Sequence, residues 1–281
     1  MSFAWASSAT PIDETKVSTI KARINLITGY GPITLKTLAH ERLIMAEISV
    51  IIPALNEEKN IGECLKALRA QKTHLEFDIV VSDGGSKDGT REIAEKYADK
   101  VVITKKRGIW VGRNTGAKAA NGKAYAFIDA DSIVPKNYLD SVFPILEDES
   151  ISGLSTAFRF DDRSAKLKLV EDICNEYLLL KGSFGKGELL GFNAVVSKKT
   201  FWKAGGFPNA PLEDGALAIK LRKMGRLVFL PEPKVVTSAR RLEKQGILKS
   251  TLYYAQIGLE SALPKSPLNR LLVYRDYIPV R

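Results

Sequence analysis

The spacing of apolar residues divides the chain into a first part with little regularity and a longer part in which strands and helices alternate. Residues 1–45 are mixed in character and are interrupted by Gly29, Gly31 and Pro32, which break regular structure. We interpret this part as an N-terminal extension.

Three strand and helix units then follow one another. The apolar run "EISVIIPAL" (47–55) predicts a buried strand, and Asn56 stands where it would cap a helix whose apolar residues lie three or four apart. "FDIVVSDGGSKDGT" predicts a strand that ends at Asp83, a glycine-rich turn and a second helix. "VVITK", "WVGRNTGAKAA" and "AYAFIDAD" continue the alternation. The pattern predicts an α/β fold with a parallel sheet covered on both faces, which would bind ligands beyond the carboxyl ends of its strands.

After residue 132 the alternation loosens. Pro135 is expected to start a helix, "ISGLSTAFRF" reads as a strand, and the apolar spacing across residues 164–180 predicts a longer helix. Glu213 and Asp214 open another predicted helix, which the strands "RLVFLP" and "KVVTS" follow. This half of the chain is therefore expected to be mixed in architecture.

Composition narrows the class of protein. With 281 residues, 45% of them hydrophobic, the chain is long enough to bury a substantial core. Its net charge of +10 favours anionic partners such as phosphates, nucleic acid or an acidic membrane surface. Cys64 and Cys174 have no zinc-ligand spacing and indicate no disulfide framework, which fits a reducing cytosol. No apolar run is long enough to span a membrane and no signal peptide begins the chain, so we expect a cytoplasmic protein.

The stretch "YAFIDADS" places Asp129 and Asp131 at the end of a predicted buried strand, with the small Ala130 between them. Two carboxylates held together repel each other unless they share a cation. Oxygen ligands without His or Cys favour Mg²⁺ or Mn²⁺, which commonly bridge carboxylates to substrate phosphates. The alternative is that the two acids only cap a turn or the following helix.

Three further motifs stand beside this acid pair, and together the four segments resemble the family 2 glycosyltransferases. The segments are "SVIIPALNEEKNI", "VVSDGGSKDGT", "GRNTGAKAANGKAYAFIDADS", and "KAGGF" followed by "LED". The resemblance covers roughly residues 47–240, and it implies a GT-A fold and the use of nucleotide-diphosphate sugars. It divides a catalytic domain at 46–240 into a donor half (46–132) and an acceptor half (133–240), which a helical segment at 241–281 follows.

The resemblance also implies roles for the donor half. The residues that match the segment around the nucleotide's base and ribose are Pro53, Ala54, Leu55, Asn56 and Glu57. Asp83 matches an acid that bonds the edge of the base, while Gly84 and Gly85 allow close backbone approach. A turn or helix-cap role for Asp83 is the alternative.

Two arginines lie in the segment that lines the donor in the family, and the sequence does not choose between them. Arg107 and Arg113 both qualify, and each could equally be a surface charge. Asn114 and Gly116 are expected to begin the following helix.

The acids of the strand end and of the second half take different roles by resemblance. Asp129 matches the carboxylate nearest the ribose, and Asp131 matches the ligand of a Mn²⁺ or Mg²⁺ ion that bridges the diphosphate. Asp214, in the motif that begins with Glu213, matches the base of inverting members. The alternative is that both acids only complement a helix dipole.

The remaining site residues belong to the acceptor side or the diphosphate. Phe192 and Asn193 precede the acid motif, and the chain has "VVTSARR" where many metal-dependent relatives carry a His. Arg240 and Arg241 are expected to supply positive charge to the diphosphate, with a solvated basic face as the alternative.

Other functions fit less well. A sugar nucleotidyltransferase or a dehydrogenase normally has a glycine-rich loop after the first strand, and "PALNEEKN" has no glycine. A nucleic-acid or lipid-binding module would explain the charge, but the basic residues are spread along the chain. Dolichol-phosphate sugar synthases are close kin of the family and would place the protein at the inner face of a membrane. Tyr253, Tyr254, Leu259 and Leu263 at helical spacing would help there or would pack into a core.

Overall fold

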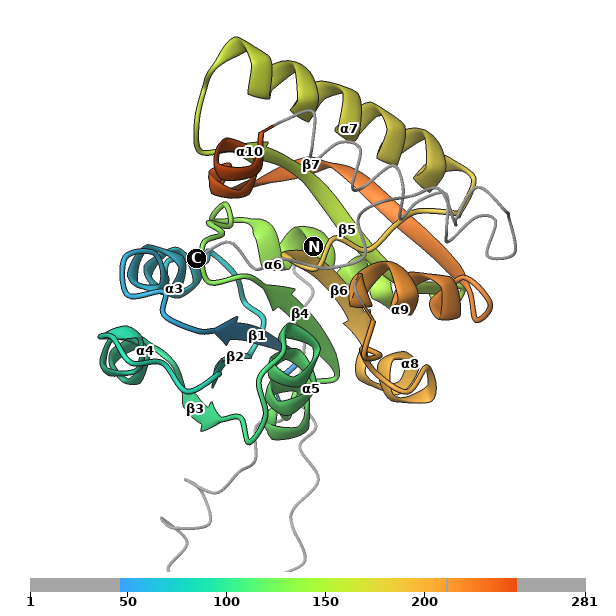
Figure 1. Cartoon of the computed structure of the whole chain (residues 1–281). Coiled ribbons are helices and arrows are strands. Elements are labelled where there is room, and N and C mark those ends of the chain that lie inside the picture. The colour runs from blue at the N-terminus through green and yellow to red at the C-terminus, as the bar shows by residue number, and fades with distance from the viewer. Residues whose placement is uncertain (1–45, 211, 247–281) are drawn as a thin grey trace, which may run out of the picture. The chain divides into compact units, whose positions relative to one another are not determined.

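A computed structural model describes residues 46–210 and 212–246, and within them a single sheet organises the chain (Figure 1). The predicted extension at 1–45 and the apolar tail residues from Tyr253 to Leu263 lie outside the described residues. The strands of the sheet are β1 (Ile48–Ala54), β2 (Phe77–Asp83), β3 (Lys100–Ile103), β4 (Ala124–Ile128), β5 (Ile151–Phe160), β6 (Asn193–Ser197) and β7 (Arg226–Thr237). Their order across the sheet is β3-β2-β1-β4-β6-β5-β7.

The direction of one strand decides where the acceptor half meets the donor half. Strands β3, β2, β1 and β4 pair in parallel, whereas β6 pairs antiparallel with both β4 and β5. Ile128 at the end of β4 is therefore paired with Asn193 at the start of β6. The segment before β6 thus lies at the same edge of the sheet as the acids that follow β4.

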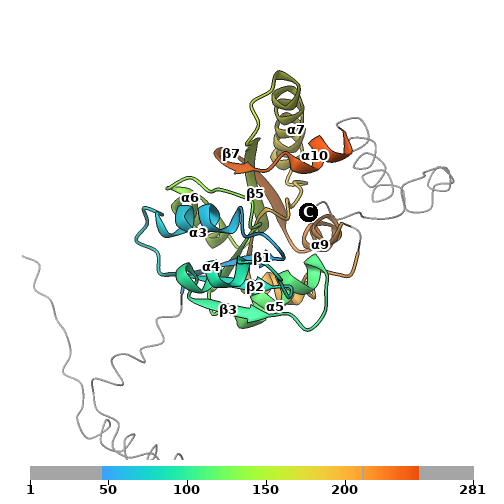
Figure 2. The ribbon, with the colours of Figure 1, turned by 60° about the vertical axis from the view of Figure 1, so that its left-hand side comes forward.

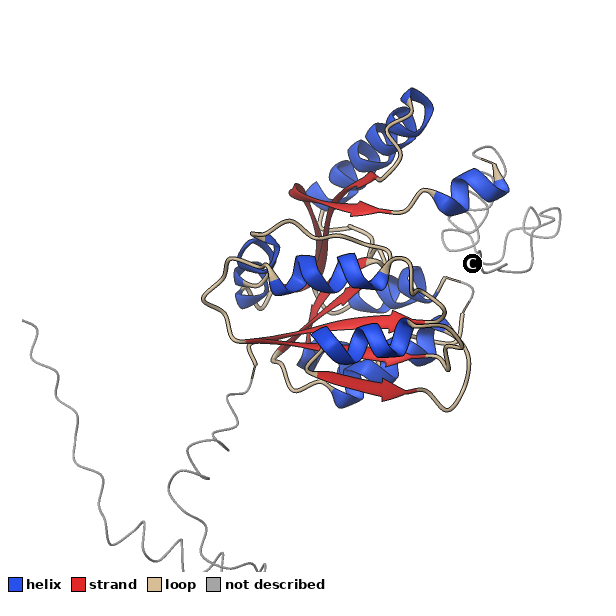
Figure 3. Ribbon diagram, turned by 90° about the vertical axis from the view of Figure 1, so that its left-hand side faces the viewer, coloured by secondary structure: helices blue, strands red, loops and turns tan. Residues whose placement is uncertain are grey.

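Helices cover both faces of the sheet, as the alternating pattern predicts (Figure 3). The described helices are α3 (Ile61–Arg69), α4 (Thr90–Tyr97), α5 (Ile109–Ala119), α6 (Tyr138–Val142), η1 (Pro144–Glu147), α7 (Ala165–Ser183), α8 (Lys198–Lys203), α9 (Glu213–Leu221) and α10 (Arg240–Gln245). One buried cluster joins α3, α4 and α6 to one face, and a second joins α5, α8 and α9 to the other. Strand β1 serves both, because Val50 and Ile52 point to the first cluster and Ile51 to the second.

Helix α5 lies very close to the sheet, and a glycine makes this possible. A Cβ atom at Gly116 would stand only 2.5 Å from Cγ2 of Ile51, so any larger residue would push the helix away. The prediction that Asn114 and Gly116 begin this helix is wrong, because α5 starts five residues before Asn114. Because α5 begins at Ile109, Arg113 lies inside a helix that packs against the sheet.

Three other local predictions are corrected. Asn56 does not cap α3, because its backbone has a φ of 55° and its side-chain oxygen accepts from the amide of Lys87 instead. The helix expected at Pro135 begins at Tyr138. The two strands predicted after α9 form one strand, β7, which continues past the prolines through a shift in its register with β5.

Helix α7 packs through one face against the ends of β5 and β7, near α10 (Figure 2). Leu167 and Leu178 are buried on this face, and so are the polar Glu171 and Asn175, which accept from the backbone amides of β5. The opposite face is apolar and exposed, which the sequence did not predict; its residues are Leu169, Ile173, Tyr177, Leu180 and Phe184. Among the helices of residues 46–246, α7 included, none combines the length and the apolar character needed to cross a bilayer.

Candidate active site

The loops after β1 and β2 are bound to each other at the carboxyl edge of the sheet. The amide of Asn56 donates to Ser86 Oγ at 2.9 Å, and the amide of Glu57 donates to Thr90 Oγ1 at 2.7 Å. The amide of Gly84 donates to the carbonyl of Ala54 at 2.8 Å. The predicted segment Pro53–Glu57 and the predicted turn at Asp83 and Gly84 therefore form one unit.

Asp83 lies inside this unit with little exposure to solvent. Its side chain is bound by Ser86, whose amide donates to both carboxylate oxygens and whose hydroxyl donates to Oδ1. This is the geometry of a turn-forming Asp, the alternative that the sequence left open. The role of Asp83 at a nucleotide base stays a prediction; Oδ2, which among the described residues accepts only from the amide of Ser86, keeps a lone pair for a further donor.

The structure separates the two candidate arginines. Arg107 is exposed in the turn between β3 and α5, whereas Arg113 is only 3% exposed on the inner side of α5. The guanidinium of Arg113 donates to Asp129 Oδ1 at 2.9 Å and forms an ion pair with Glu213. It also lies over the ring of Phe207, 5.2 Å from its centroid. Arg113 therefore joins the acid after β4 to the acid that opens α9.

Gly191 makes room for this guanidinium, and the sequence did not single it out. A Cβ atom at this position would lie 2.8 Å from Cζ of Arg113. The amide of Gly191 also donates to Asp214 Oδ2 at 2.9 Å, while Oδ1 of Asp214 accepts from the amide of Gly215 at 2.8 Å. A glycine next to the apolar run "FNAVV" was the available signal.

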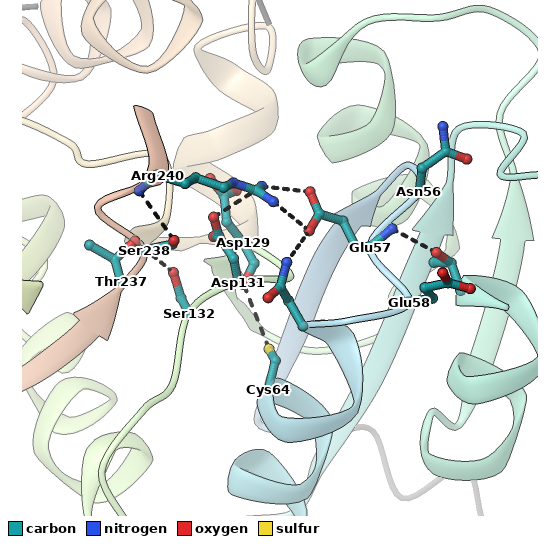
Figure 4. Close-up of polar contacts among 12 residues, drawn as sticks. Asn56, Glu57, Glu58, Cys64, Asp129, Asp131, Ser132, Thr237, Ser238 and Arg240 are labelled. Atoms are coloured by element: carbon teal, nitrogen blue, oxygen red, sulfur yellow. Dashed lines mark hydrogen bonds and ion pairs between the residues drawn. The ribbon is translucent and has the colours of Figure 1, made fainter. Parts of the chain in front are cut away.

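A second arginine joins the acids on the other side of the site (Figure 4). Arg240, at the start of α10, donates to Oε2 and Oε1 of Glu57 at 2.9 and 2.6 Å. Its Nη2 also lies 3.0 Å from Asp131 Oδ2. The side chains of Glu57 and Asp131 are only 11% and 13% exposed. The pairing places Arg240 beside Asp131, and its role at a diphosphate stays a prediction; the side chain of Arg241 lies outside the described part of the chain.

The acids around each of the two arginines outnumber it. Glu57, Asp129 and Asp131 act on Arg240 and form the acid cluster after β4, while Asp129, Glu213 and Asp214 act on Arg113. Burial and repulsion from Asp129 and Glu57 raise the pKa of Asp131 to about 7, although Arg240 opposes the shift. Burial raises the pKa of Glu213 to about 7 as well, with Asp214 adding to the shift and Arg113 opposing it. Burial, together with an excess of carboxylates over guanidiniums, makes Asp131 and Glu213 hold their protons to higher pH.

Phe192 and Asn193 differ in their environments. Asn193 is fully buried, where its amide donates to Thr156 and its carbonyl oxygen accepts from the hydroxyl of Tyr138 at 2.7 Å. This placement does not support contact between Asn193 and an acceptor, because its polar groups already have partners. Phe192 is partly buried and its ring packs edge-on against Phe158.

The acids after β4 fit a divalent cation that a ligand helps to hold. Within residues 46–246, position 211 apart, no three His, Cys, Asp or Glu side chains are arranged around a shared metal position. Mg²⁺ and Mn²⁺ commonly bind through one or two carboxylates and the phosphates of a substrate, and Asp131, with Asp129 two residues before it, offers carboxylates of that kind. The hydroxyl of Thr237, at the end of β7, is buried and accepts from Ser132 Oγ at 3.2 Å.

The sequence matches the profile of a known protein family. The profile described as Glycosyl transferase family 2 matches residues 49–205, which is more than half of the chain. The chain belongs to this family. The match ends before Glu213 and Asp214, so the roles expected of these two residues stay predictions.

Relatives of this glycosyltransferase family lie at moderate identity. Glycosyltransferase AglE of Haloferax volcanii is 26% identical over 178 residues, which are 60% of this chain and 58% of AglE. The chain thus spans little more than half the length of that relative.

Two solved structures are similar in fold. One is the mannosyltransferase PcManGT from Pyrobaculum calidifontis in complex with GDP-Man and Mn²⁺. It superposes with a TM-score of 0.64 at 21% identity, and the match covers 80% of this chain and 66% of the PcManGT chain. TarS of Staphylococcus aureus in complex with UDP-GlcNAc superposes with a TM-score of 0.56 at 22% identity, covering 69% and 59%. These similarities confirm the predicted GT-A fold.

Proposed function

We propose that this chain transfers a sugar from a UDP- or GDP-sugar to a hydroxyl acceptor with inversion at the anomeric carbon. The observation that supports it most is the bridge through Arg113, which brings Asp129 of the donor half next to the Glu213 and Asp214 motif of the acceptor half. A donor and an acceptor held at these two motifs would meet at one edge of the sheet. Family membership and the nucleotide-sugar complexes of both structural neighbours support the same donor class.

The donor half would hold the nucleotide. The joined loops at Pro53–Glu57 and at Asp83 and Gly84 would enclose the base and ribose, with Asp129 facing the ribose. Arg107 is exposed at the same edge and is the candidate for contact with the diphosphate. Arg113 is buried and would act indirectly, by orienting Asp129.

A divalent cation would be held by Asp131 together with the diphosphate. When bound, Mn²⁺ or Mg²⁺ supplies positive charge to the leaving diphosphate. The complex of one neighbour with Mn²⁺ supports this cofactor. Arg240, already at Asp131, would add a guanidinium whose planar geometry suits phosphate oxygens.

Asp214 would take the proton from the acceptor hydroxyl. Each of its oxygens accepts one backbone amide, so the carboxylate is fixed in orientation and keeps a lone pair for the proton. The acceptor oxygen would form its bond to the anomeric carbon from the face opposite the diphosphate. The bond to the diphosphate breaks as the new one forms, and the nucleoside diphosphate leaves with the electron pair.

Turnover of donors tests the proposal. Purified full-length protein is incubated with a panel of UDP- and GDP-sugars, with Mn²⁺ or with a chelator, and release of UDP or GDP is measured. We expect metal-dependent release from at least one donor and its loss in Asp131→Ala. Asp172→Ala is the matched control, because Asp172 is an exposed acid paired with Lys168 on α7. If no nucleoside diphosphate binds at millimolar concentration with metal present, the proposal is wrong.

The acceptor would be a sugar, a glycan or a lipid-linked hydroxyl. The dolichol-phosphate type of acceptor, and with it contact with the inner face of a membrane, remains an alternative within the same proposal.

A further inference from the structure

Arg240 lies where positive charge is most needed in the acid cluster after β4. Its two terminal nitrogens bind both oxygens of Glu57, and one of them also contacts Asp131. Glu57 belongs to the loop after β1, Asp131 follows β4 and Arg240 follows β7 (Figure 4). One side chain from the last described helix therefore pairs with two acids of the donor half.

This guanidinium occupies the surroundings that a divalent cation would use. The proposed metal ligand is the carboxylate of Asp131, and Arg240 is already 3.0 Å from its Oδ2. A metal ion binds a carboxylate oxygen at about 2.0–2.1 Å. Two cations so close together on one carboxylate repel each other strongly, because the site is only partly open to water. Arg240 in this position therefore competes with the metal.

The two arginines of the site differ in how firmly they are held. Arg113 is 3% exposed and is enclosed by Asp129, Glu213, Phe207 and Gly191. Arg240 is 30% exposed and begins a helix of only six residues. Of this pair, Arg240 is the one that can leave its partners without opening the core.

The charges around the site indicate what would make it leave. The acids Glu57, Asp129, Asp131 and Glu213 outnumber the two guanidiniums that bind them, so the site favours the approach of a further cation. A diphosphate brings further negative charge and oxygens that a guanidinium binds well. A bound diphosphate would therefore give Arg240 a new anionic partner, which leaves the carboxylate of Asp131 free for the metal.

We propose that Arg240 is an exchangeable counter-ion, which balances Glu57 and Asp131 in the nucleotide-free protein and passes to the diphosphate when the metal binds. The inference rests on the proposed function, because it takes Asp131 as the metal ligand and a diphosphate as the donor's leaving group. It follows that nucleotide and metal bind cooperatively, since each removes an obstacle for the other.

Binding of Mn²⁺ to the full-length protein tests this exchange without any turnover. Free Mn²⁺ is followed by its electron paramagnetic resonance signal, first with protein alone and then with UDP or GDP, after subtraction of the Mn²⁺ that the nucleotide itself binds. We expect the nucleotide to tighten Mn²⁺ binding to the wild type by about tenfold or more. Arg240→Gln should bind Mn²⁺ alone about tenfold more tightly than the wild type, and the nucleotide should then add little.

Matched variants show where the effect arises. Arg240→Lys keeps the charge but not the bidentate geometry, so its gain should be smaller than that of Arg240→Gln. Arg240→Gln combined with Asp131→Asn should lose the gain. Arg222→Gln, which removes a similarly exposed arginine paired with Glu188, should bind Mn²⁺ as the wild type does.

Two failures remain distinguishable. A folded Arg240→Gln protein that binds Mn²⁺ no more tightly than the wild type overturns the exchange, whatever the nucleotide does. Absence of nucleotide binding to the wild type in the presence of metal overturns the proposed function instead, and the Mn²⁺ comparison without nucleotide still decides whether Arg240 competes at Asp131.

Discussion

Arg113 and Glu213 form an ion pair inside the protein although 100 residues separate them in the sequence. Their side chains are 3% and 7% exposed, and the same guanidinium also binds Asp129. The pair thus fixes the start of α9 relative to the end of β4. The ion pairs of Arg113 help to hold the two acid motifs next to each other.

Replacement of Arg113 by Met should destabilise the protein by about 3–5 kcal/mol, because it leaves the buried carboxylate of Glu213 without its partner. Arg107→Met should change the free energy of unfolding by no more than about 0.5 kcal/mol, because Arg107 is exposed. Urea denaturation of both variants measures the difference. Equal losses would show that the buried pair contributes no more than a surface charge.

Glu213 predicts a dependence of stability on pH. Its pKa is raised from 4.5 to about 7, so the folded protein binds more protons than the unfolded chain between these values. Stability from this group therefore falls as pH rises from about 4.5 to 7. Glu213→Gln should remove a fall on the order of 2 kcal/mol, measured by thermal unfolding at pH 5 and pH 8. An unchanged slope would assign the pH dependence to other groups.

Asp131 should cost the metal-free protein stability. Its carboxylate is nearly buried and is repelled by Asp129 and Glu57 more than Arg240 attracts it. Asp131→Asn should therefore raise the free energy of unfolding at pH 8 by about 1 kcal/mol, measured in the presence of a chelator, while it removes metal-dependent turnover. Asp172→Asn is the control at an exposed position. A loss of stability in Asp131→Asn would mean that the contact with Arg240 outweighs the repulsion.

Asp214→Asn separates binding from transfer. The amide keeps an oxygen that accepts one of the two backbone amides, so the loop at Gly191 should hold its position. It cannot take a proton from the acceptor, and transfer should fall by about 10²-fold or more while the donor binds as before. Nucleotide-sugar binding by calorimetry and product formation are measured on the same sample. Unchanged transfer would return Asp214 to the role of complementing the dipole of α9.

Much of the donor half could be predicted from the sequence because its logic is local. Strands that end at Ala54, Asp83 and Ile128 alternate with helices, and parallel strands place their carboxyl ends together. This alone gathers Glu57, Asp83 and Asp131 at one edge.

The partners across the site depend on contacts that no local pattern contains. Arg107 and Arg113 look alike in the sequence, and only the position of Glu213 and the insertion of β6 beside β4 decide which of them is buried. Arg240 and Glu57 are 183 residues apart, and their pairing requires the whole sheet to be assembled. The role of Asp83 was ambiguous for a different reason. An Asp that binds a serine in a turn and an Asp that binds a ligand can have the same sequence around them.

The lack of a side chain at Gly191 also predicts that positions 191 and 113 change together in evolution. A larger residue there would collide with the guanidinium of Arg113, and a shorter residue at 113 would leave the space empty beside Gly191. Substitution at either position alone should destabilise the protein. Relatives that lack Gly at position 191 should therefore also lack Arg at position 113. An alignment of relatives read at these two columns would then report the presence of the buried bridge without any structure.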